Sequence, residues 1–346
     1  KNKNKIILSP FTIFDVINMA ICAGAQPVFC DVEKKSITID LENIKKVYDE
    51  NVGAIMITHT HVINKDIQEI VKFAKEKNII LIEDCAISFG TKLNNKYIGT
   101  IGDIGFFSFG IFKFVSSLNG GLIITKDSFI FKKIFNEHKS FLKQDYNMLI
   151  KNFLKSTFVS FFTNRYIFKF FSSFIIKFGF LNNIKSINQF SKNDPNPHFL
   201  ENLPESYKKN ISNTQAGLIL DQAKMHIIDF KIRIKNAKIY YNNLKDIKDL
   251  IIPKFNDNFE NGWINFPIQY NKRDKLLKFL FLNNRDLAIY FYRNCNDLDI
   301  FNKYNNPKLV NIKNIVKEII ILPTYPKYSE KQIYRNISLI KKYFNK

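Results

Sequence analysis

The chain has 346 residues, 46% of them hydrophobic, so it can bury a large core and form more than one domain. Its formal net charge of +21 favours anionic partners such as phosphate groups or an acidic membrane surface, and no recognised nucleic-acid-binding motif accompanies that charge. The four cysteines form no C-x-x-C pair, which argues against a disulfide framework and fits reduced thiols in the cytoplasm.

The first part of the chain alternates short apolar runs with amphipathic segments, a pattern typical of an α/β layer with a mostly parallel sheet. A helix is expected at 67–74 between two of the strands. Buried strands are predicted at 28–30, 54–57, 79–82, 106–109 and 122–125. Ligands of such sheets bind beyond the carboxyl ends of the strands, and Asp84 follows one of these ends.

Residues 141–192 are different in character. They are crowded with Phe, Ile and Lys, and no Asp or Glu occurs between Asp145 and Asp194. Beyond them the strand and helix patterns return. A strand is predicted at 263–268, and helices are predicted at 212–241, 272–281 and 329–344.

Three side chains near two of the strand ends suit a pyridoxal phosphate site. Lys113 can form the Schiff base, Asp84 can pair with the pyridinium nitrogen, and Ser108 can hold the phosphate. Such a lysine needs a lowered pKa, from burial or nearby positive charge, so that a neutral amine attacks the aldehyde. The alternative interpretations are a surface lysine, a capping or loop acid, and a polar position on a half-buried strand.

The motifs around these residues resemble those of a known family, the DegT/DnrJ/EryC1/StrS sugar aminotransferases. Each motif is weak alone, whereas their order and spacing together are specific. The resemblance covers most of the chain except roughly residues 140 to 200. The matching segments are Thr12 after Ser9-Pro10, 24–31, 54–66 including His59, 82–86, Gly102-Asp103, the lysine segment 107–121, 212–216 and 322–326.

The resemblance implies the type I fold of pyridoxal phosphate-dependent transferases. This is an α/β fold with a mostly parallel central sheet, helices on both faces and a smaller C-terminal α/β domain. We expect a large cofactor-binding domain at 1–140, a basic aromatic helical insertion at 141–200, an interface and linking helix at 201–245, and the small domain at 246–346. The family has an earlier helix and a Gly-Thr turn that binds phosphate, so an N-terminal part is expected to be missing here.

The resemblance also assigns roles to single residues. Lys113 would be the catalytic Schiff-base lysine, Asp84 the pyridinium partner, Ser108 a phosphate contact, and Ala86 would pack beneath the ring. Lys208 aligns with an Asn that the neighbouring subunit lends to the phosphate, and a lysine can hold phosphate as a point charge. The implied cofactor is pyridoxal 5′-phosphate, and no metal is expected.

The activity that follows is amination of a nucleotide-linked keto-sugar to an amino sugar for surface glycan biosynthesis. The resemblance implies glutamate as amino donor and a homodimer with its sites at the subunit interface. A cytoplasmic enzyme is expected, peripheral to the inner membrane face if the insertion binds lipid.

Several positions depart from the family pattern. Ile87 replaces the usual Gln, Ile13 stands where an aromatic ring usually stacks on the cofactor, and Asn119 replaces a Glu. Ile13, Ile87 and the missing N-terminal part favour an alternative, a catalytically degenerate relative that acts as a membrane-associated scaffold or partner subunit. The family's sugar dehydratases are a third reading, but they typically replace the lysine by His, so Lys113 argues against it. His59 matches a family His near the rim of the site, and a structural His fits equally.

The insertion has two competing interpretations. Residues 150–180 alternate phenylalanines with cations, and the apolar runs are too interrupted for a membrane-spanning helix. They fit either a pair of interfacial helices on an anionic lipid surface or a helical hairpin packed within the protein's own dimer.

Overall fold

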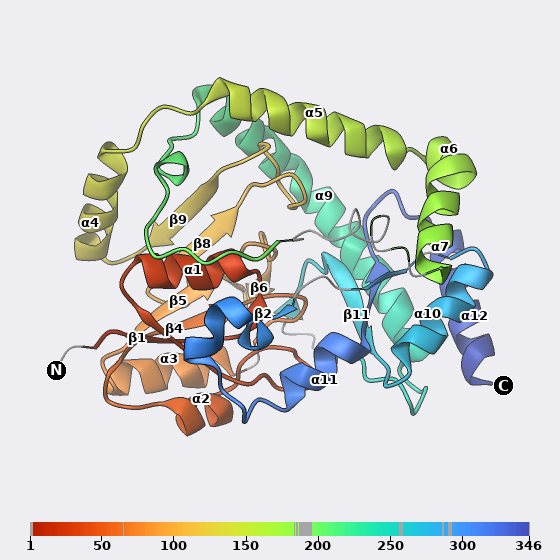
Figure 1. Ribbon diagram of the computed structural model, residues 1–346, viewed down its shortest axis with the longest axis horizontal. Coiled ribbons are helices and arrows are strands. Elements are labelled where there is room, and N and C mark those ends of the chain that lie inside the picture. The colour runs from red at the N-terminus through yellow and green to blue at the C-terminus, as the bar shows by residue number, and fades with distance from the viewer. Residues whose placement is uncertain are drawn as a thin grey trace.

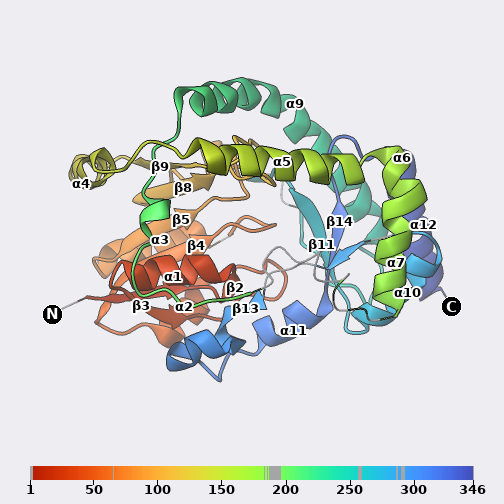
Figure 2. The same cartoon turned by 45° about the horizontal axis from the view of Figure 1, so that its top comes forward.

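The computed structural model describes residues 3–64, 66–182, 184, 186, 196–255, 259–285, 287–289 and 293–345. Two sheets lie side by side, a larger one formed by the first part of the chain and a smaller one formed by the last part (Figure 2). Of the predicted insertion, residues 183, 185 and 187–195 lie outside the described part of the chain.

The larger sheet has six strands in the order β3-β1-β4-β5-β8-β9. The first five run parallel and β9 pairs antiparallel with β8, so the predicted, mostly parallel sheet is confirmed. The strands are β1 (Lys5–Leu8), β3 (Gln26–Phe29), β4 (Val52–Thr58), β5 (Ile80–Asp84), β8 (Ile104–Ser108) and β9 (Gly121–Thr125).

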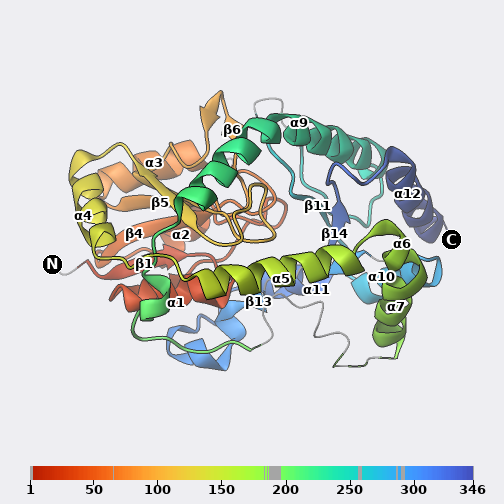
Figure 3. The same ribbon diagram turned by 90° about the horizontal axis from the view of Figure 1, so that it is seen from above.

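Helices cover both faces of this sheet, and α1 and α3 lie on opposite sides of it (Figure 3). The first hydrophobic core forms between these layers and includes Ile7, Ile55 and Ile70, none of which is exposed to solvent. The helices are α1 (Phe14–Cys22), α2 (Leu41–Val47), α3 (Ile67–Glu76) and α4 (Ser128–Lys139).

The smaller sheet is antiparallel, with the order β11-β14-β12. It packs with three helices around a second core that includes Tyr240, Phe266 and Ile320. Its elements are β11 (Asn265–Gln269), β12 (Ala288–Ile289), β14 (Ile319–Pro323), α9 (Asn213–Leu244), α10 (Arg273–Leu282) and α12 (Glu330–Phe344).

Helix α9 runs from the larger sheet to the smaller one (Figure 1). It begins after Ser212, whose hydroxyl accepts the N–H of Gln215, while the Gln215 side chain accepts the N–H of Ser212. This reciprocal capping box satisfies two of the N–H groups that a helix start leaves free, and it explains why the helix starts where the sequence predicts.

The insertion forms helices rather than strands. These are α5 (Tyr146–Phe162), α6 (Arg165–Ile167), a π-helical turn η1 (Phe168–Ser172) and α7 (Ser173–Leu181). Figure 1 shows α5 along the margin of the molecule and α7 beside α10. Among the helices of the described residues, none combines the length and the apolar character needed to cross a bilayer.

The remaining elements are short. Strand β6 pairs with β7 and β10, and β2 pairs with β13. Their bounds, with those of the last helical segments, are β2 (Phe11–Thr12), β6 (Lys92–Leu93), β7 (Lys96–Tyr97), β10 (Phe259–Glu260), β13 (Arg293–Asn294), η2 (Glu205–Tyr207), η3 (Cys295–Asp297), η4 (Asp299–Tyr304) and α11 (Asn311–Glu318).

Candidate active site

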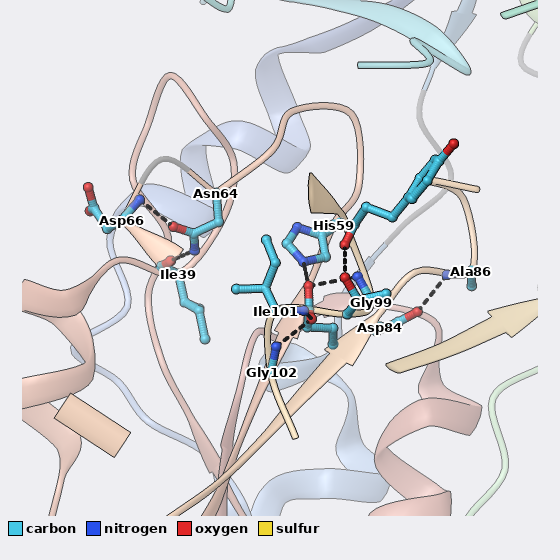
Figure 4. Close-up of polar contacts among 12 residues, drawn as sticks. Ile39, His59, Asn64, Asp66, Asp84, Ala86, Gly99, Ile101 and Gly102 are labelled. Carbon is cyan, nitrogen blue, oxygen red and sulfur yellow. Dashed lines mark hydrogen bonds and ion pairs between the residues drawn. The ribbon is translucent and has the colours of Figure 1, made fainter. Parts of the chain in front are cut away.

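Asp84 is the last residue of β5, at the carboxyl edge of the larger sheet. Its side chain is buried, with 3% of its surface exposed, and its Oδ1 accepts the N–H of Ala86 at 3.0 Å (Figure 4). Burial raises the pKa of Asp84, while the N–H of Ala86 and the charge of Lys113 act in the opposite direction. The chain therefore holds a carboxylate in a place that would favour a cationic partner.

Lys113 lies on the segment that connects β8 to β9, and its side chain is half-buried. Burial lowers the pKa of this lysine, and the charge of Asp84 opposes the shift. The two groups thus lie close enough to influence each other. A lysine with a lowered pKa supplies more of the neutral amine that nucleophilic attack requires.

Ser108 and Lys113 converge beside Gly110. A Cβ atom built on Gly110 would lie 3.7 Å from Ser108 Oγ and 4.0 Å from Lys113 Cγ. Ser108 is the last residue of β8, and its hydroxyl accepts the Gly110 N–H at 3.4 Å. The Ser108 hydroxyl and the base of the Lys113 side chain therefore lie on either side of a glycine that leaves space between them.

Two glutamines of α9 hold the segment that carries the lysine. Gln222 pairs with the backbone of Ser116 in both directions: its Oε1 accepts the N–H at 3.1 Å, and its Nε2 donates to the carbonyl at 2.6 Å. Gln215 Nε2 donates to the carbonyls of Ser117 and Asn119, each at 3.1 Å. The sequence indicated a motif at 212–216 but did not predict these contacts. The pattern that could have predicted them is the helical spacing of Gln215 and Gln222, which places both amides on one face of the helix.

Glu83, the neighbour of Asp84 on β5, has a separate set of partners. Its Oε1 accepts the N–H groups of Ile101 and Gly102, and its Oε2 accepts that of Gly99 and lies 3.1 Å from His59 Nε2 (Figure 4). Burial alone would raise the pKa of Glu83, but His59 and these N–H groups bring it below the ordinary value. Glu83 therefore fastens the turn at 99–102 to the end of the strand.

His59 has a structural role in this network. It is 1% exposed, so it is buried rather than placed at an open rim. Its ring nitrogen, a Glu83 oxygen and Cys85 Sγ all lie within 4.8 Å of one another. Both oxygens of Glu83 already accept hydrogen bonds, and burial raises the pKa of Cys85 well above its usual range, so the thiol stays protonated. The cluster is explained by hydrogen bonding without a metal.

The other predicted site residues lie as follows. Lys208 precedes α9, and its ammonium lies 2.8 Å from the Glu205 carboxylate. Within this chain it therefore forms an ion pair with Glu205 and does not join the site of Asp84 and Lys113. Ile13 stands directly before α1 and is 40% exposed, whereas Phe14 is 5% exposed and packs edge-on against His198. Phe14 thus belongs to the interior and does not replace the stacking ring that Ile13 lacks.

The wall behind the lysine segment is aromatic. Phe89 packs edge-on against Phe107, Phe109 and His226, and His226 Nε2 lies 3.0 Å from the Phe89 carbonyl. The guanidinium of Arg233, from the same helix as His226, lies 5.0 Å from the centre of the Phe114 ring. Neither α9 residue was singled out from the sequence, because both meet partners that are remote in the chain.

Comparisons with known proteins place this chain in a family. A sequence model described as "DegT/DnrJ/EryC1/StrS aminotransferase family" matches residues 1–153 and 180–341. The chain belongs to this family. The predicted family, type I fold and enzyme class, an aminotransferase, are thereby confirmed. The match leaves out residues 154–179, within the helical insertion.

Relatives with names are similar over different shares of the chain. The uncharacterized protein MJ1066 of Methanocaldococcus jannaschii is 25% identical over 99% of this chain and 80% of its own length. GDP-perosamine synthase of Vibrio cholerae is 33% identical, but over 38% of this chain and 35% of that enzyme. The chain therefore matches only about a third of that synthase.

Solved structures agree on the fold. An aminotransferase from Psychrobacter cryohalolentis superimposes with a TM-score of 0.76 at 18% identity, over 99% of this chain and 81% of that one. Helicobacter pylori PseC, titled as an aminotransferase of pseudoaminic acid biosynthesis, gives a TM-score of 0.71 at 18% identity, over 99% and 80% of the two chains.

Proposed function

We propose that the protein is a pyridoxal phosphate-dependent aminotransferase that converts a nucleotide-linked keto-sugar to an amino sugar. The observation that carries this proposal is the proximity of buried Asp84 and half-buried Lys113 at the carboxyl edge of the sheet. These groups fit the cofactor: a carboxylate for its ring nitrogen, an amine for its aldehyde, and a hydroxyl with a neighbouring glycine for its phosphate.

Each residue would do a distinct task. When bound, pyridoxal phosphate would supply the aldehyde that takes up the amino group and the ring that accepts electrons. Asp84 would hold a cationic ring nitrogen by charge, which its buried position strengthens. Lys113, whose pKa burial lowers, would accept and return the proton at the substrate carbon. Ser108 would donate its hydroxyl to the phosphate, and Ala86 would pack against the ring.

The substrate class rests on charge and on the names of relatives. The net charge of +21 suits a diphosphate-linked sugar. Among the relatives are GDP-perosamine synthases, a UDP-N-acetyl-3-dehydro-alpha-D-glucosamine 3-aminotransferase of Acidithiobacillus ferrooxidans at 29% identity, and the lipopolysaccharide biosynthesis protein RfbH of Salmonella typhimurium at 35%. These names support amination of a nucleotide-linked sugar. We propose in addition that the amino sugar is destined for a surface glycan, that it is made in the cytoplasm and that glutamate is the donor.

We also propose a homodimer, in which Lys208 would reach the phosphate of the neighbouring subunit. In the single chain its ammonium contacts Glu205, and the Lys208 side chain is 35% exposed. A partly exposed lysine bound to a surface acid can exchange that acid for a phosphate at little cost, because surface ion pairs contribute little.

The experiment is reconstitution of the purified protein with pyridoxal phosphate, followed by borohydride reduction and peptide mapping. The expected result is a yellow protein that carries the reduced cofactor on Lys113, and a Lys113→Ala variant that carries none there. Exposed Lys72 of α3 provides the control, since Lys72→Ala should label normally.

A second candidate, a scaffold that has lost catalysis, is favoured by one observation. Ile87, where the family has Gln, is 8% exposed and offers no hydrogen bond. A protein that gains no absorbance with added cofactor, and shows no label after reduction, would support the scaffold and refute the enzyme.

A further inference from the structure

The helical insertion exposes apolar side chains where a soluble protein normally presents polar ones. On α5, Ile150, Leu154 and Phe161 share one side at helical spacing and are 57%, 60% and 59% exposed. Asn152, Ser156 and Val159 occupy the opposite side and are less exposed, and Asn152 Nδ2 donates to the Leu118 carbonyl of the lysine segment. The outward face of α5 is therefore the apolar one.

The next helices repeat this arrangement. Phe170, Phe174 and Phe178 follow one another at intervals of one turn and are 71%, 75% and 58% exposed. The inner side of α7 is anchored, because Phe180 stacks on Phe281 of α10 with ring centres 4.4 Å apart. The exposed rings thus belong to a helix that is fixed to the second core, and their exposure is not that of a loose end.

Charge in this segment has a single sign. Residues 146–182 contain Lys151, Lys155, Arg165, Lys169 and Lys177 and no Asp or Glu. Lys151 and Lys155 flank the outward stripe of α5, and Lys169 Nζ lies 4.8 Å from the centre of the Phe170 ring. Cations beside exposed aromatic rings form a surface that buries rings in acyl chains and leaves ammonium groups among anionic headgroups.

We propose that α5 to α7 form a docking surface for an anionic lipid membrane. The family match leaves out residues 154–179, which make up most of this segment, so the family model does not account for the exposed rings and cations there. Charge complementarity decides between occupants. A second copy placed on this face by a twofold axis would set five cations against the same five, whereas anionic headgroups neutralise them.

The geometry also suits a surface contact rather than insertion across the bilayer. No described helix is long and apolar enough to span it, and the polar inner side of α5 faces the protein. Figure 1 shows α5 along the upper margin of the molecule and α7 near its right-hand margin. Because Asn152 on the inner side of α5 binds the Leu118 carbonyl, the protein would lie on the membrane with α5 between the lysine segment and the lipid headgroups.

The test is flotation of the full chain with vesicles. Equal parts of phosphatidylglycerol and phosphatidylcholine should carry the protein upward, vesicles of phosphatidylcholine alone should not, and high salt should release it. Lys151→Glu combined with Lys155→Glu should weaken binding by roughly 600-fold, since each unit of charge contributes about fivefold and each reversal changes two units. Phe170→Ser with Phe174→Ser should weaken it too.

The control is Lys72→Glu with Lys75→Glu on α3, which makes the same charge change on another exposed helix. This control should lower binding by less than tenfold, whereas the α5 reversal should lower it several hundred-fold, and circular dichroism of both variants checks folding. Absence of flotation, equal binding to phosphatidylcholine alone, or equal losses in both reversals would overturn the proposal. So would a change from dimer to monomer in the phenylalanine variant, which would assign the face to a second copy.

Discussion

Lys113 and Asp84 each counteract the effect of burial on the other's pKa. Burial raises the pKa of Asp84 and the charge of Lys113 lowers it, whereas burial lowers the pKa of Lys113 and the charge of Asp84 raises it. Burial disfavours the charged form of both groups, and each charge stabilises the other. A bound ligand that carries both charges could stabilise the charged forms of both residues. Substitution of either residue should therefore change the free energy of unfolding as well as the activity.

Lys113→Met should stabilise the protein at neutral pH while abolishing amination. The folded-state pKa of Lys113 lies below 10.5, so the unfolded chain holds more protons between those two values and stability rises with pH in that window. Denaturation curves at several pH values should show the largest gain for the variant below the folded pKa and a shrinking gain toward 10.5. Parallel pH profiles for the two proteins would contradict the shift.

Asp84→Asn should change the dependence of stability on pH in the acidic range, whereas Lys113→Met changes it in the alkaline range. The folded-state pKa of Asp84 lies above 3.8, so the native carboxyl holds its proton longer, and stability falls as pH rises through that folded pKa. The variant should be at least as stable as the parent at pH 7 and should lose the advantage near pH 3. Cofactor binding, measured by absorbance, should fall because the anion for the ring nitrogen is gone.

Glu83→Gln should destabilise the fold, by about 3 kcal/mol, because an amide offers N–H groups to backbone donors that are already fixed in place. The folded-state pKa of Glu83 lies below 4.5, so its contribution is present above that value and is lost as pH falls through the folded pKa. The loss should therefore be smaller in acid. Glu69→Gln on exposed α3 is the matched control and should change urea midpoints little.

Gln222→Leu should loosen the lysine segment. It leaves the N–H and carbonyl of Ser116 without their amide partner, which should cost about 2 kcal/mol and weaken cofactor binding. Thermal unfolding and cofactor titration measure the two effects. Gln68→Leu on α3, at an exposed position, should leave both unchanged, and equal cofactor affinity in both variants would exclude a positioning role for Gln222.

Gly110→Ala separates stability from binding. The added Cβ would meet Ser108 Oγ and Lys113 Cγ only at ordinary contact distance, so the fold should tolerate it and gain up to about 1 kcal/mol from reduced chain entropy. Cofactor affinity should fall, because the methyl group occupies space beside the Ser108 hydroxyl that would hold the phosphate. Gly217→Ala on α9, where nothing lies within 4 Å, should stabilise without affecting the cofactor.

Local chemistry made much of the fold predictable. Runs of Ile and Val gave β4 and β5, the apolar run up to Ile82 placed Asp84 at a strand end, and Ser212 announced the start of α9. The strand expected from Trp263 begins instead at Asn265, because Trp263 has a φ of 42°, which no strand residue adopts.

The site's supporting contacts could not be predicted in the same way. Gln222 and Ser116 are separated by 106 positions, and His59 and Glu83 by 24, so only the folded chain brings them together. Glu83 adjoins the predicted cofactor partner, and nothing in a single sequence distinguishes a carboxylate that binds backbone N–H groups from one that binds a ligand. Proximity across the fold settles such roles, whereas residue type alone does not.

One helix joins the two halves of the molecule. The beginning of α9 grips the lysine segment through Gln215 and Gln222, while Ala237, Tyr240 and Leu244 near its end belong to the second core. A continuous helix of 32 residues bends little, so a rotation of one end also moves the other end. If the smaller sheet moves toward a bound substrate, α9 would therefore transmit that movement to the segment that carries Lys113.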